Sequence, residues 1–411
     1  MKTFLVGGAV RDTLLNLPVK ERDWVVIGET PESMINQGFR YVGKDFPVFL
    51  HPQTNEEYAL ARTERKIAKG YRGFHIFASP DVTLAQDLLR RDLTINAMAM
   101  TDSGDIIDPY GGTDDLKNRV FRHVSPAFTE DPVRVLRLAR FAARYKTLGF
   151  SIAPSTHMLL KDMVDAGELD ALVPERIWIE TTKALSEPYP TEFFEVLRQC
   201  GALAKIFPEI DRLFGIPQPE KYHPEIDCGV HSLMALAQAT KLTNRVEIRF
   251  AALVHDLGKA QSPIETLPHH HGHEQRGVMI LESMCKRLPI PNSFKSLALN
   301  VTAYHTLCHK IFELNAATFI DLLQTLGAFR SKHLLQDFVL ACEADSRGRK
   351  HFEETTYHSG RRFLELANIA IQIDTSTANH TGLKGKQIGD AIRQLRIKAV
   401  NAQMHSATTQ L

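Results

Sequence analysis

The chain has 411 residues, enough for two to four domains of ordinary size. Hydrophobic residues make up 44% and charged residues 24%, which is the balance of a folded globular protein and excludes a disordered chain. The 49 Lys and Arg against 48 Asp and Glu leave a net charge of +1, so any nucleic-acid contact must come from a local concentration of charge.

The cysteines and the apolar segments indicate the cellular compartment of the protein. Five cysteines form an odd set without a C-x-x-C spacing, which argues against a disulfide framework and against a thiolate zinc site. The apolar stretch at residues 4–10 is too short for a signal peptide, and nowhere do 18 apolar residues run together. We therefore expect a cytoplasmic protein without a membrane partner. The sequence does not decide between a monomer and a homodimer.

Strand and helix signals are mixed over the first 125 residues. Short strands are predicted at 4–6 and 23–27, with a helix between them that ends before Pro18, and two more strands at 46–50 and 57–61. From Asp131 onward helical signals dominate, for example at 177–185, 193–197 and 319–326. The predicted fold class is α+β, a mixed sheet with helices followed by an all-α remainder.

The first 25 residues contain a pattern suited to phosphate chemistry. The turn Gly7-Gly8 lets backbone amides approach phosphates, and Arg11 adds positive charge. Glu21 and Asp23 are two residues apart, so on a strand they would project from one face. Each feature alone is common in turns and strand edges, but two carboxylates that share divalent ions suit nucleotidyl transfer.

A local basic strip follows. Between Lys117 and Lys146 there are eight Lys or Arg and two acidic residues, and Asp131-Pro132 predicts a helix start with Asp as the cap. Alone, such a strip is typical of a solvated helix face, but an all-arginine face is costly by repulsion and favours anion binding. The basic residues of interest are the pair Arg90-Arg91 and, on one helical face, Arg134, Arg137, Arg140 and Arg144.

Together these motifs resemble the class II CCA-adding tRNA nucleotidyltransferases, which have a polymerase-β-like head. The resemblance is carried by L-V-G-G-A-V-R-D at 5–12, E-x-D at 21–23, R-R-D-L-T-I-N-A at 90–97 and E-D-P-V-R-V-L-R-L-A-R-F at 130–141. It implies template-independent addition of the 3′ CCA of tRNA from CTP and ATP.

The resemblance also implies residue roles. Glu21 and Asp23 would be catalytic and hold Mg²⁺, although the family most often has D-x-D, and a third carboxylate is expected at Glu57 or Glu56. Asp131 and Arg134 would hydrogen-bond the base edge as a protein template. The residues expected to contact the nucleotide generally are Gly8, Arg11, Arg91, Arg137 and Arg140.

Histidine marks a second site. Nine of the 18 histidines lie between His223 and His309, in the order H…HD…D formed by His231, His255-Asp256 and Asp345. Imidazole and carboxylate ligands at this density favour a divalent metal that acidifies water for attack on phosphate, although a polar loop of solvated histidines is the alternative for the run at 269–273. The pair His255-Asp256 ends an apolar segment that predicts a helix ending at Gly258.

This pattern resembles an HD phosphohydrolase domain, with His231, His255, Asp256 and Asp345 as ligands of Ni²⁺ or a similar ion and His273 and His305 as accessory positions. An HD domain behind such a head is the architecture of bacterial multifunctional CCA proteins, and implies phosphatase, 2′-nucleotidase and 2′,3′-cyclic phosphodiesterase activities. The expected domains are a head at 1–125, a helical body at 126–222, the HD domain at 223–346 and a helical tail at 347–411.

Three alternatives stay open from the sequence. A bacterial poly(A) polymerase shares the head but usually has a longer basic tail and lacks HD. An HD nucleotide hydrolase with a vestigial head leaves the head motifs unexplained. A non-catalytic RNA-binding protein has no need of Glu21 and Asp23.

Overall fold

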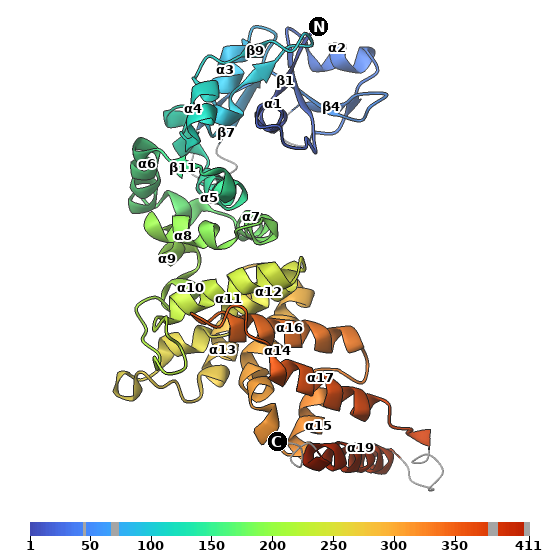
Figure 1. Ribbon diagram of the computed structural model, residues 1–411. Coiled ribbons are helices and arrows are strands. Elements are labelled where there is room, and N and C mark those ends of the chain that lie inside the picture. The colour runs from blue at the N-terminus through green and yellow to red at the C-terminus, as the bar shows by residue number, and fades with distance from the viewer. Residues whose placement is uncertain (44–46, 67–73, 377–384, 407–411) are drawn as a thin grey trace. The chain divides into compact units, whose positions relative to one another are not determined.

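The computed structural model describes residues 1–43, 47–66, 74–376 and 385–406 (Figure 1). The chain divides into two compact units: Met1–Thr181 with Glu192–Ile206, and Thr182–Thr191 with Phe207–Leu411. Each unit is described by itself. Within the described residues, no helix combines the length and apolar character that a membrane crossing requires.

The first unit is built on a mixed seven-stranded sheet of order β3-β4-β5-β2-β1-β8-β9. The central strand β2 pairs antiparallel with β1 and parallel with β5. The strands are β1 (Lys2–Val6), β2 (Asp23–Ile27), β3 (Arg40–Tyr41), β4 (Val48–Leu50), β5 (Glu57–Leu60), β8 (Ala99–Met100) and β9 (Ile106–Ile107). The strands predicted at 4–6, 23–27, 46–50 and 57–61 are thereby confirmed, with residues 44–46 outside the described part of the chain.

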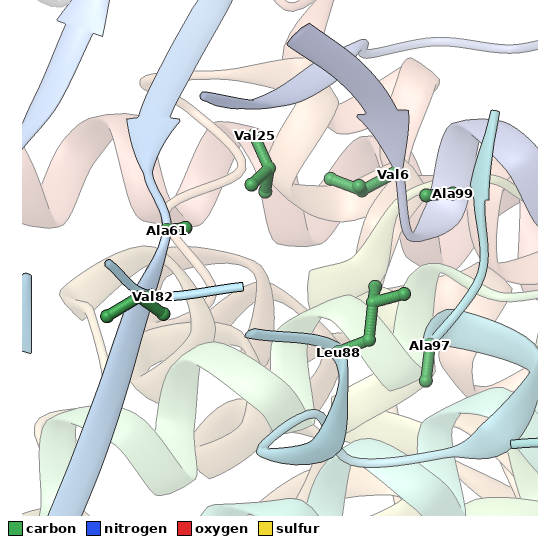
Figure 2. Packing of buried hydrophobic residues seen from close by; sticks show 7 residues of the cluster. All are labelled: Val6, Val25, Ala61, Val82, Leu88, Ala97 and Ala99. Carbon is green, nitrogen blue, oxygen red and sulfur yellow. The ribbon is translucent and has the colours of Figure 1, made fainter. Parts of the chain in front are cut away.

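Both faces of this sheet are buried, because successive side chains of a strand point to opposite sides. Val25 packs with Val6, Ala99 and Leu88 on one face (Figure 2). Its neighbour Val26 packs on the other face in a second apolar cluster. Burying each Val or Leu side chain contributes about 1.5–3 kcal/mol, so β2 is anchored from both sides.

Helices and short strand pairs complete the first unit. A hairpin of β6 (Arg62–Lys66) and β7 (Phe74–Ala78) and a parallel pair of β10 (Val120–Phe121) and β11 (Ser151–Ile152) lie outside the main sheet. The helices are α1 (Gly8–Leu14), α2 (Pro31–Asn36), α3 (Leu84–Leu89), α4 (Gly112–Asn118), α5 (Val133–Tyr145), α6 (Pro154–Asp165), α8 (Thr191–Gln199) and α9 (Ala202–Ile206), while α7 (Pro174–Ser186) runs into the second unit.

Helices are the only regular secondary structure of the second unit within its described residues (Figure 1). Four helices, α11, α12, α14 and α16, pack against one another. The predicted mixed head and all-α remainder are confirmed. The helices are α10 (Pro208–Asp211), α11 (Cys228–Leu242), α12 (Val246–Val254), α13 (His273–Arg287), α14 (Asn292–His309), α15 (Ala316–Thr325), α16 (Lys332–Arg347), α17 (His358–Ile371) and α19 (Lys386–Ser406).

Candidate active sites

Carboxylates of the first unit gather at one edge of the sheet. Asp23 begins β2 and Glu57 begins β5, and the two are direct register partners in a parallel pair, so their side chains leave the same face. Glu21 precedes β2 by two residues, so the predicted sharing of one strand by Glu21 and Asp23 is wrong in detail. The two are nevertheless close. Burial raises the pKa of Asp23, the Arg91 charge lowers it, and the Glu21 charge raises it further.

The choice between Glu56 and Glu57 follows from the hydrogen bonds. Glu56 accepts a hydrogen bond from the indole of Trp24 at 2.9 Å, and Trp24 points to the opposite side of β2 from Asp23. Glu57 is therefore the carboxylate that lies beside Asp23. Oxygen ligands of this kind fit Mg²⁺. Burial first and the Glu21 charge second raise the pKa of Asp23, and a bound cation would favour the charged form of this carboxylate.

The turn between β1 and α1 lies against two guanidinium groups. Gly7 has a φ of 68°, and a Cβ there would come within 2.9 Å of Nη1 of Arg91. A Cβ on Gly8 would lie 3.4 Å from Nη2 of Arg11. Glycine is favoured at position 7 by its positive φ, whereas a Cβ on Gly8 would make only an ordinary contact with Arg11. The structure brings together Gly8, Arg11 and Arg91, for which the resemblance implied contacts to the nucleotide.

Arg11 is fixed by its surroundings. Its guanidinium pairs with Asp12 at 2.9 Å and lies over the rings of Phe141 and Tyr145, 5.1 and 5.2 Å from their centroids. Tyr145 in turn donates to Asp12 at 2.7 Å. Because these rings belong to α5, Arg11 ties the glycine turn to the arginine-bearing helix.

The arginines of α5 each have a partner within the unit. Arg137 pairs with Asp92 at 2.9 Å and Arg140 with Glu180 at 2.8 Å. Burial of Asp92 raises its pKa, but the Arg137 charge and nearby hydrogen bonds outweigh burial and lower it. The expected repulsion along this face is therefore offset by acidic residues from α7 and from the segment after α3, which sequence spacing did not reveal.

The two residues expected to read the base are held differently. Asp131 forms a two-bond ion pair with Arg176, at 3.0 and 2.8 Å, and its Oδ1 accepts from the amide of Val133. The prediction of Asp131 as the helix cap is wrong by one residue, because the helix begins at Val133 and Pro132 is its N-cap. The side chain of Asp131 still accepts from the first amide of the helix. Arg134 is buried and donates to the carbonyl oxygens of Ala127 and Arg90, at 2.7 and 2.5 Å.

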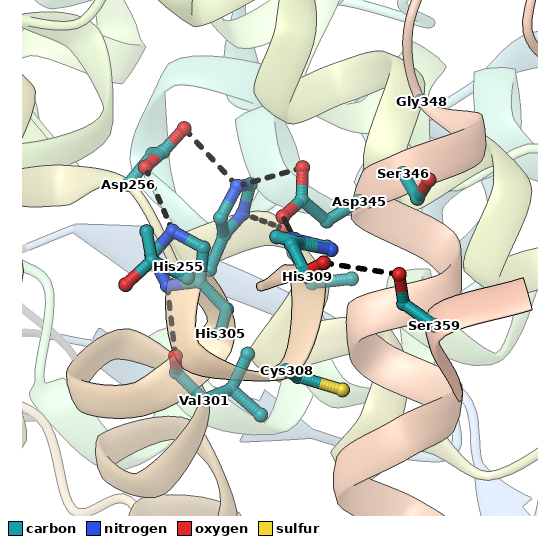
Figure 3. Close-up of polar contacts among 12 residues, drawn as sticks. His255, Asp256, Val301, His305, Cys308, His309, Asp345, Ser346, Gly348 and Ser359 are labelled. Atoms are coloured by element: carbon teal, nitrogen blue, oxygen red, sulfur yellow. Dashed lines mark hydrogen bonds and ion pairs between the residues drawn. The ribbon is translucent and has the colours of Figure 1, made fainter. Parts of the chain in front are cut away.

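In the second unit the four predicted metal ligands meet. Nε2 of His231 lies 3.0 Å from Oδ1 of Asp345, and Nε2 of His255 lies 3.4 Å from the same oxygen. Oδ2 of Asp256 lies 3.1 Å from His255 and 3.8 Å from His231. All four side chains are at least nine-tenths buried. Figure 3 shows His255, Asp256 and Asp345 turned toward one another.

The hydrogen bonds of these imidazoles leave Nε2 available. Nδ1 of His231 donates to the carbonyl of Gly348 at 3.0 Å, and Nδ1 of His255 donates to that of Ala252 at 2.8 Å. With Nδ1 bonded in this way, Nε2 is the atom of each ring that can bind a metal, which would displace the proton that the neighbouring carboxylates favour there. Nε2 of His255 and Oδ1 of Asp256 are buried without a hydrogen-bond partner. These orphaned atoms fit a divalent metal.

Charge at this site is concentrated. Burial lowers the pKa of His255, but the carboxylates of Asp256 and Asp345 outweigh burial and raise it to about 10. Lys259 approaches Oδ2 of Asp256 to 2.6 Å. The raised pKa of His255 and the close approach of Lys259 both show that the buried carboxylates of this site stabilise positive charge.

Supporting residues that sequence reasoning missed surround the ligands. Oε1 of Glu225 lies 3.0 Å from Nδ1 of His231, so a carboxylate orients that ring. Nε2 of His309 donates to Oδ2 of Asp345 at 2.7 Å, and the hydroxyl of Tyr357 donates to Nδ1 of His309 at 2.8 Å. No spacing rule links these residues to the H…HD…D pattern, because the chain brings them in from α14, the start of α17 and the loop before α11.

The segment after the HD pair differs from expectation. Helix α12 ends at Val254, and Gly258 lies in a short 3₁₀ turn (Leu257–Gln261), so the prediction of a helix that ends at Gly258 is wrong. A Cβ on Gly258 would lie 1.9 Å from the carbonyl oxygen of His273. Glycine is required here because α13 begins directly against the turn, which carries His273 to the metal-ligand cluster.

Comparisons with known families agree with this geometry. Residues 3–122 match the poly A polymerase head domain, and residues 149–214 match the probable RNA and SrmB-binding site of polymerase A. Residues 229–325 match the HD domain. The protein named multifunctional CCA protein from Methylococcus capsulatus is 59% identical over 401 residues, which cover 97% of this chain and 94% of that protein. The chain belongs to the multifunctional CCA protein family.

Family membership makes the chain a CCA tRNA nucleotidyltransferase with an HD domain. A second multifunctional CCA protein, from Thioalkalivibrio sulfidiphilus, is 56% identical over 97% of this chain and 98% of its own length. Among solved structures, apo form II of a CCA-adding enzyme shares the fold, with a TM-score of 0.66 and 20% identity over 100% of this chain and 92% of the other. The Thermotoga maritima CCA-adding enzyme complexed with tRNA has a TM-score of 0.63 at 19% identity, over 99% of this chain and 91% of that one.

Proposed function

We propose that the first unit adds and repairs the 3′-terminal CCA of tRNA from CTP and ATP without a nucleic-acid template. The observation that carries this proposal is the register pairing of Asp23 with Glu57 beside Glu21 and Arg91. Solved structures of the same fold include CCA-adding enzymes in complex with tRNA, with CTP and with ATP, which supports these partners.

In this proposal Glu21, Asp23 and Glu57 hold Mg²⁺, which when bound activates the primer hydroxyl and neutralises the triphosphate. The Gly7-Gly8 turn presents backbone amides to the phosphates. The arginines that line it, Arg11 and Arg91, supply positive charge from fixed positions. Because Arg11 is already ordered by Asp12 and two aromatic rings, little side-chain entropy is lost when a nucleotide binds.

Base recognition is assigned to Asp131 and Arg134. A carboxylate accepts from the exocyclic amine that cytosine and adenine share, and a guanidinium donates to ring nitrogen or carbonyl. The ion pair with Arg176 orients Asp131, and its oxygens have further lone pairs for the amine. Arg137 and Arg140 are assigned to the nucleotide in general, exchanging part of their pairing with Asp92 and Glu180 for the ligand.

We also propose that the HD domain is a metal-dependent phosphohydrolase with phosphatase, 2′-nucleotidase and 2′,3′-cyclic phosphodiesterase activity. His231, His255, Asp256 and Asp345 would hold Ni²⁺ or a similar divalent ion, which when bound acidifies water for attack on phosphorus. Glu225 and His309 would keep His231 and Asp345 in their ligand orientations. The proposed domain limits are 1–125 for the head, 126–222 for the body that reads the base and binds tRNA, 223–346 for HD and 347–411 for the tail.

The decisive experiment is incubation of the full chain with tRNA that lacks its 3′ end and with each NTP singly or CTP and ATP together. We expect addition of CCA and nothing further. A poly(A) polymerase would instead add repeated AMP without CTP. Hydrolysis of a 2′,3′-cyclic nucleotide is measured in parallel, with Asp23→Ala and His255→Ala as matched variants. The proposal is wrong if either variant loses both activities while remaining folded.

A further inference from the structure

A buried carboxylate to which no role has yet been assigned lies beside Arg91. Asp87 belongs to α3, and its side chain has an exposed fraction of 0%. Oδ2 of Asp87 lies 3.3 Å from Nη2 of Arg91. The other oxygen, Oδ1, accepts from Nε and Nη2 of Arg90 at 3.1 and 2.7 Å, and from the backbone amide of Arg62 at 3.3 Å. The two oxygens of Asp87 therefore hold different groups.

The orientation of Arg91 depends on this one contact. Among the residues that the structure describes, only Asp87 hydrogen-bonds the Arg91 guanidinium, and Nε of Arg91 is buried without a partner. Nη1 lies at the glycine turn, where a Cβ on Gly7 would come within 2.9 Å of it. Arg11 differs, because Asp12 and two aromatic rings hold it. A long side chain with a single anchor regains its rotamer freedom when that anchor is removed.

The carboxylate of Asp87 is ionised although it is buried. Burial raises its pKa, but the charges of Arg90 and Arg91 outweigh burial and lower it. Such a carboxylate has two opposite effects on an anionic ligand of Arg91. It fixes the guanidinium in place, which favours binding, and it cancels part of the positive charge, which opposes binding. Because one carboxylate pairs with two arginines, the group keeps a net positive charge, and orientation is the larger effect.

We propose that Asp87 is a positioning residue for nucleotide addition, which holds the Arg91 guanidinium at the Gly7-Gly8 turn to meet the triphosphate of CTP or ATP. This inference rests on the proposed contact of Arg91 with the nucleotide. Asp87 itself has no exposed side-chain surface with which to touch the substrate. Since every NTP carries the same triphosphate, Asp87 should affect the affinity for the nucleotide and not the choice of base.

The variant Asp87→Asn separates the contacts of the two oxygens. The amide of Asn has nearly the shape of the carboxylate, but one of its two terminal atoms is a donor. Its oxygen should take the Oδ1 position, where N–H groups of Arg90 and Arg62 converge. The NH₂ group then faces Nη2 of Arg91, and two donors cannot bond each other. Asp87→Asn should therefore release Arg91 while it keeps the contacts to Arg90 and Arg62.

The assay is incorporation of CTP on tRNA that ends at the discriminator base, and of ATP on tRNA that ends in CC, by the full chain. Asp87→Asn should raise KM for both nucleotides about tenfold, which corresponds to about 1.4 kcal/mol. The value of kcat should stay within about twofold, because a contact with the triphosphate binds substrate and transition state alike. Since KM does not depend on the concentration of active enzyme, a partly unfolded preparation still reports the change.

The variant Arg91→Ala provides the matched background. It should raise KM at least as much as Asp87→Asn does. Because Asp87 acts through Arg91, adding Asp87→Asn to Arg91→Ala should change KM less than about twofold, whereas two independent effects would multiply. The ratio of kcat/KM for UTP to that for CTP should be the same in the parent chain and in Asp87→Asn.

The possible results separate this inference from the function on which it rests. An unchanged KM in Arg91→Ala overturns the proposed contact of Arg91 with the nucleotide. A raised KM in Arg91→Ala but not in Asp87→Asn overturns only the positioning role of Asp87. A lowered KM in Asp87→Asn also overturns that role, because cancellation of charge is then the larger effect. So does an effect of Asp87→Asn that persists in full without Arg91, or that changes the ratio of UTP to CTP.

Discussion

Replacing Arg134 by Ala tests whether this residue selects the base or only supports the fold. The guanidinium is buried and donates to two backbone carbonyls, those of Ala127 and Arg90. Hydrogen bonds from a charged donor contribute about 1.5–3 kcal/mol each, so Arg134→Ala should lower the free energy of unfolding of the first unit by about 3 kcal/mol or more. Chemical denaturation of the full chain, followed by fluorescence, measures this loss.

Base selection must be read by a quantity that does not depend on the folded fraction. The ratio of kcat/KM for UTP or GTP to that for CTP has this property, because the concentration of active enzyme cancels. A bidentate base contact contributes about 1–3 kcal/mol of discrimination, so the ratio should rise roughly ten- to hundredfold in Arg134→Ala. The assay is single-turnover incorporation of each NTP on tRNA that ends at the discriminator base and on its C-extended forms.

Arg137→Ala is the matched control on the same helix. Its partner is the carboxylate of Asp92, and its assigned role is general to all nucleotides, so it should lower kcat/KM for CTP and ATP by a similar factor. If Arg134→Ala also lowers all four NTPs by one common factor, the protein-template role is refuted. Arg134 then acts only by joining Ala127 and Arg90.

Three further outcomes are expected. Asp23→Ala should abolish CTP and ATP incorporation but leave cyclic phosphodiesterase activity largely intact, and Glu21→Asp should retain incorporation; robust CCA addition by Asp23→Ala would contradict the metal assignment. The double variant His255→Ala, Asp256→Ala should lose metal-stimulated phosphatase activity and keep CCA addition, whereas phosphatase activity that persists in the purified variant argues against the HD site. Gly258→Ala places a Cβ 1.9 Å from a carbonyl oxygen of α13, so it should lower the free energy of unfolding by about 1–3 kcal/mol. It should also weaken nickel binding, because metal ligands tolerate displacements of only about 0.2 Å. Unchanged unfolding and nickel affinity would show that α13 moves freely.

Local sequence signals determined the elements that carry the sites. The strand at 23–27, the mixed head and the helical remainder follow from apolar periodicity and from glycine and proline positions, which act over a few residues. The H…HD…D order likewise predicted His231, His255, Asp256 and Asp345 as a group, and the structure brings them together. Residue type and order indicated a metal site, and the resemblance to an HD domain assigned these four residues as its ligands.

Only the tertiary structure decided which partners these residues have. Glu57 was separated from Glu56 by the register of β5 against β2, and one residue of slip reverses the face of every side chain. The ion pair of Arg176 with Asp131 joins residues 45 positions apart, and Asp345 joins His231 across 114. Contacts at such separations depend on how helices and strands pack. Such contacts leave no periodic pattern in the sequence. The chemistry of the sites could therefore be predicted from the sequence, but the partners that orient the site side chains could not.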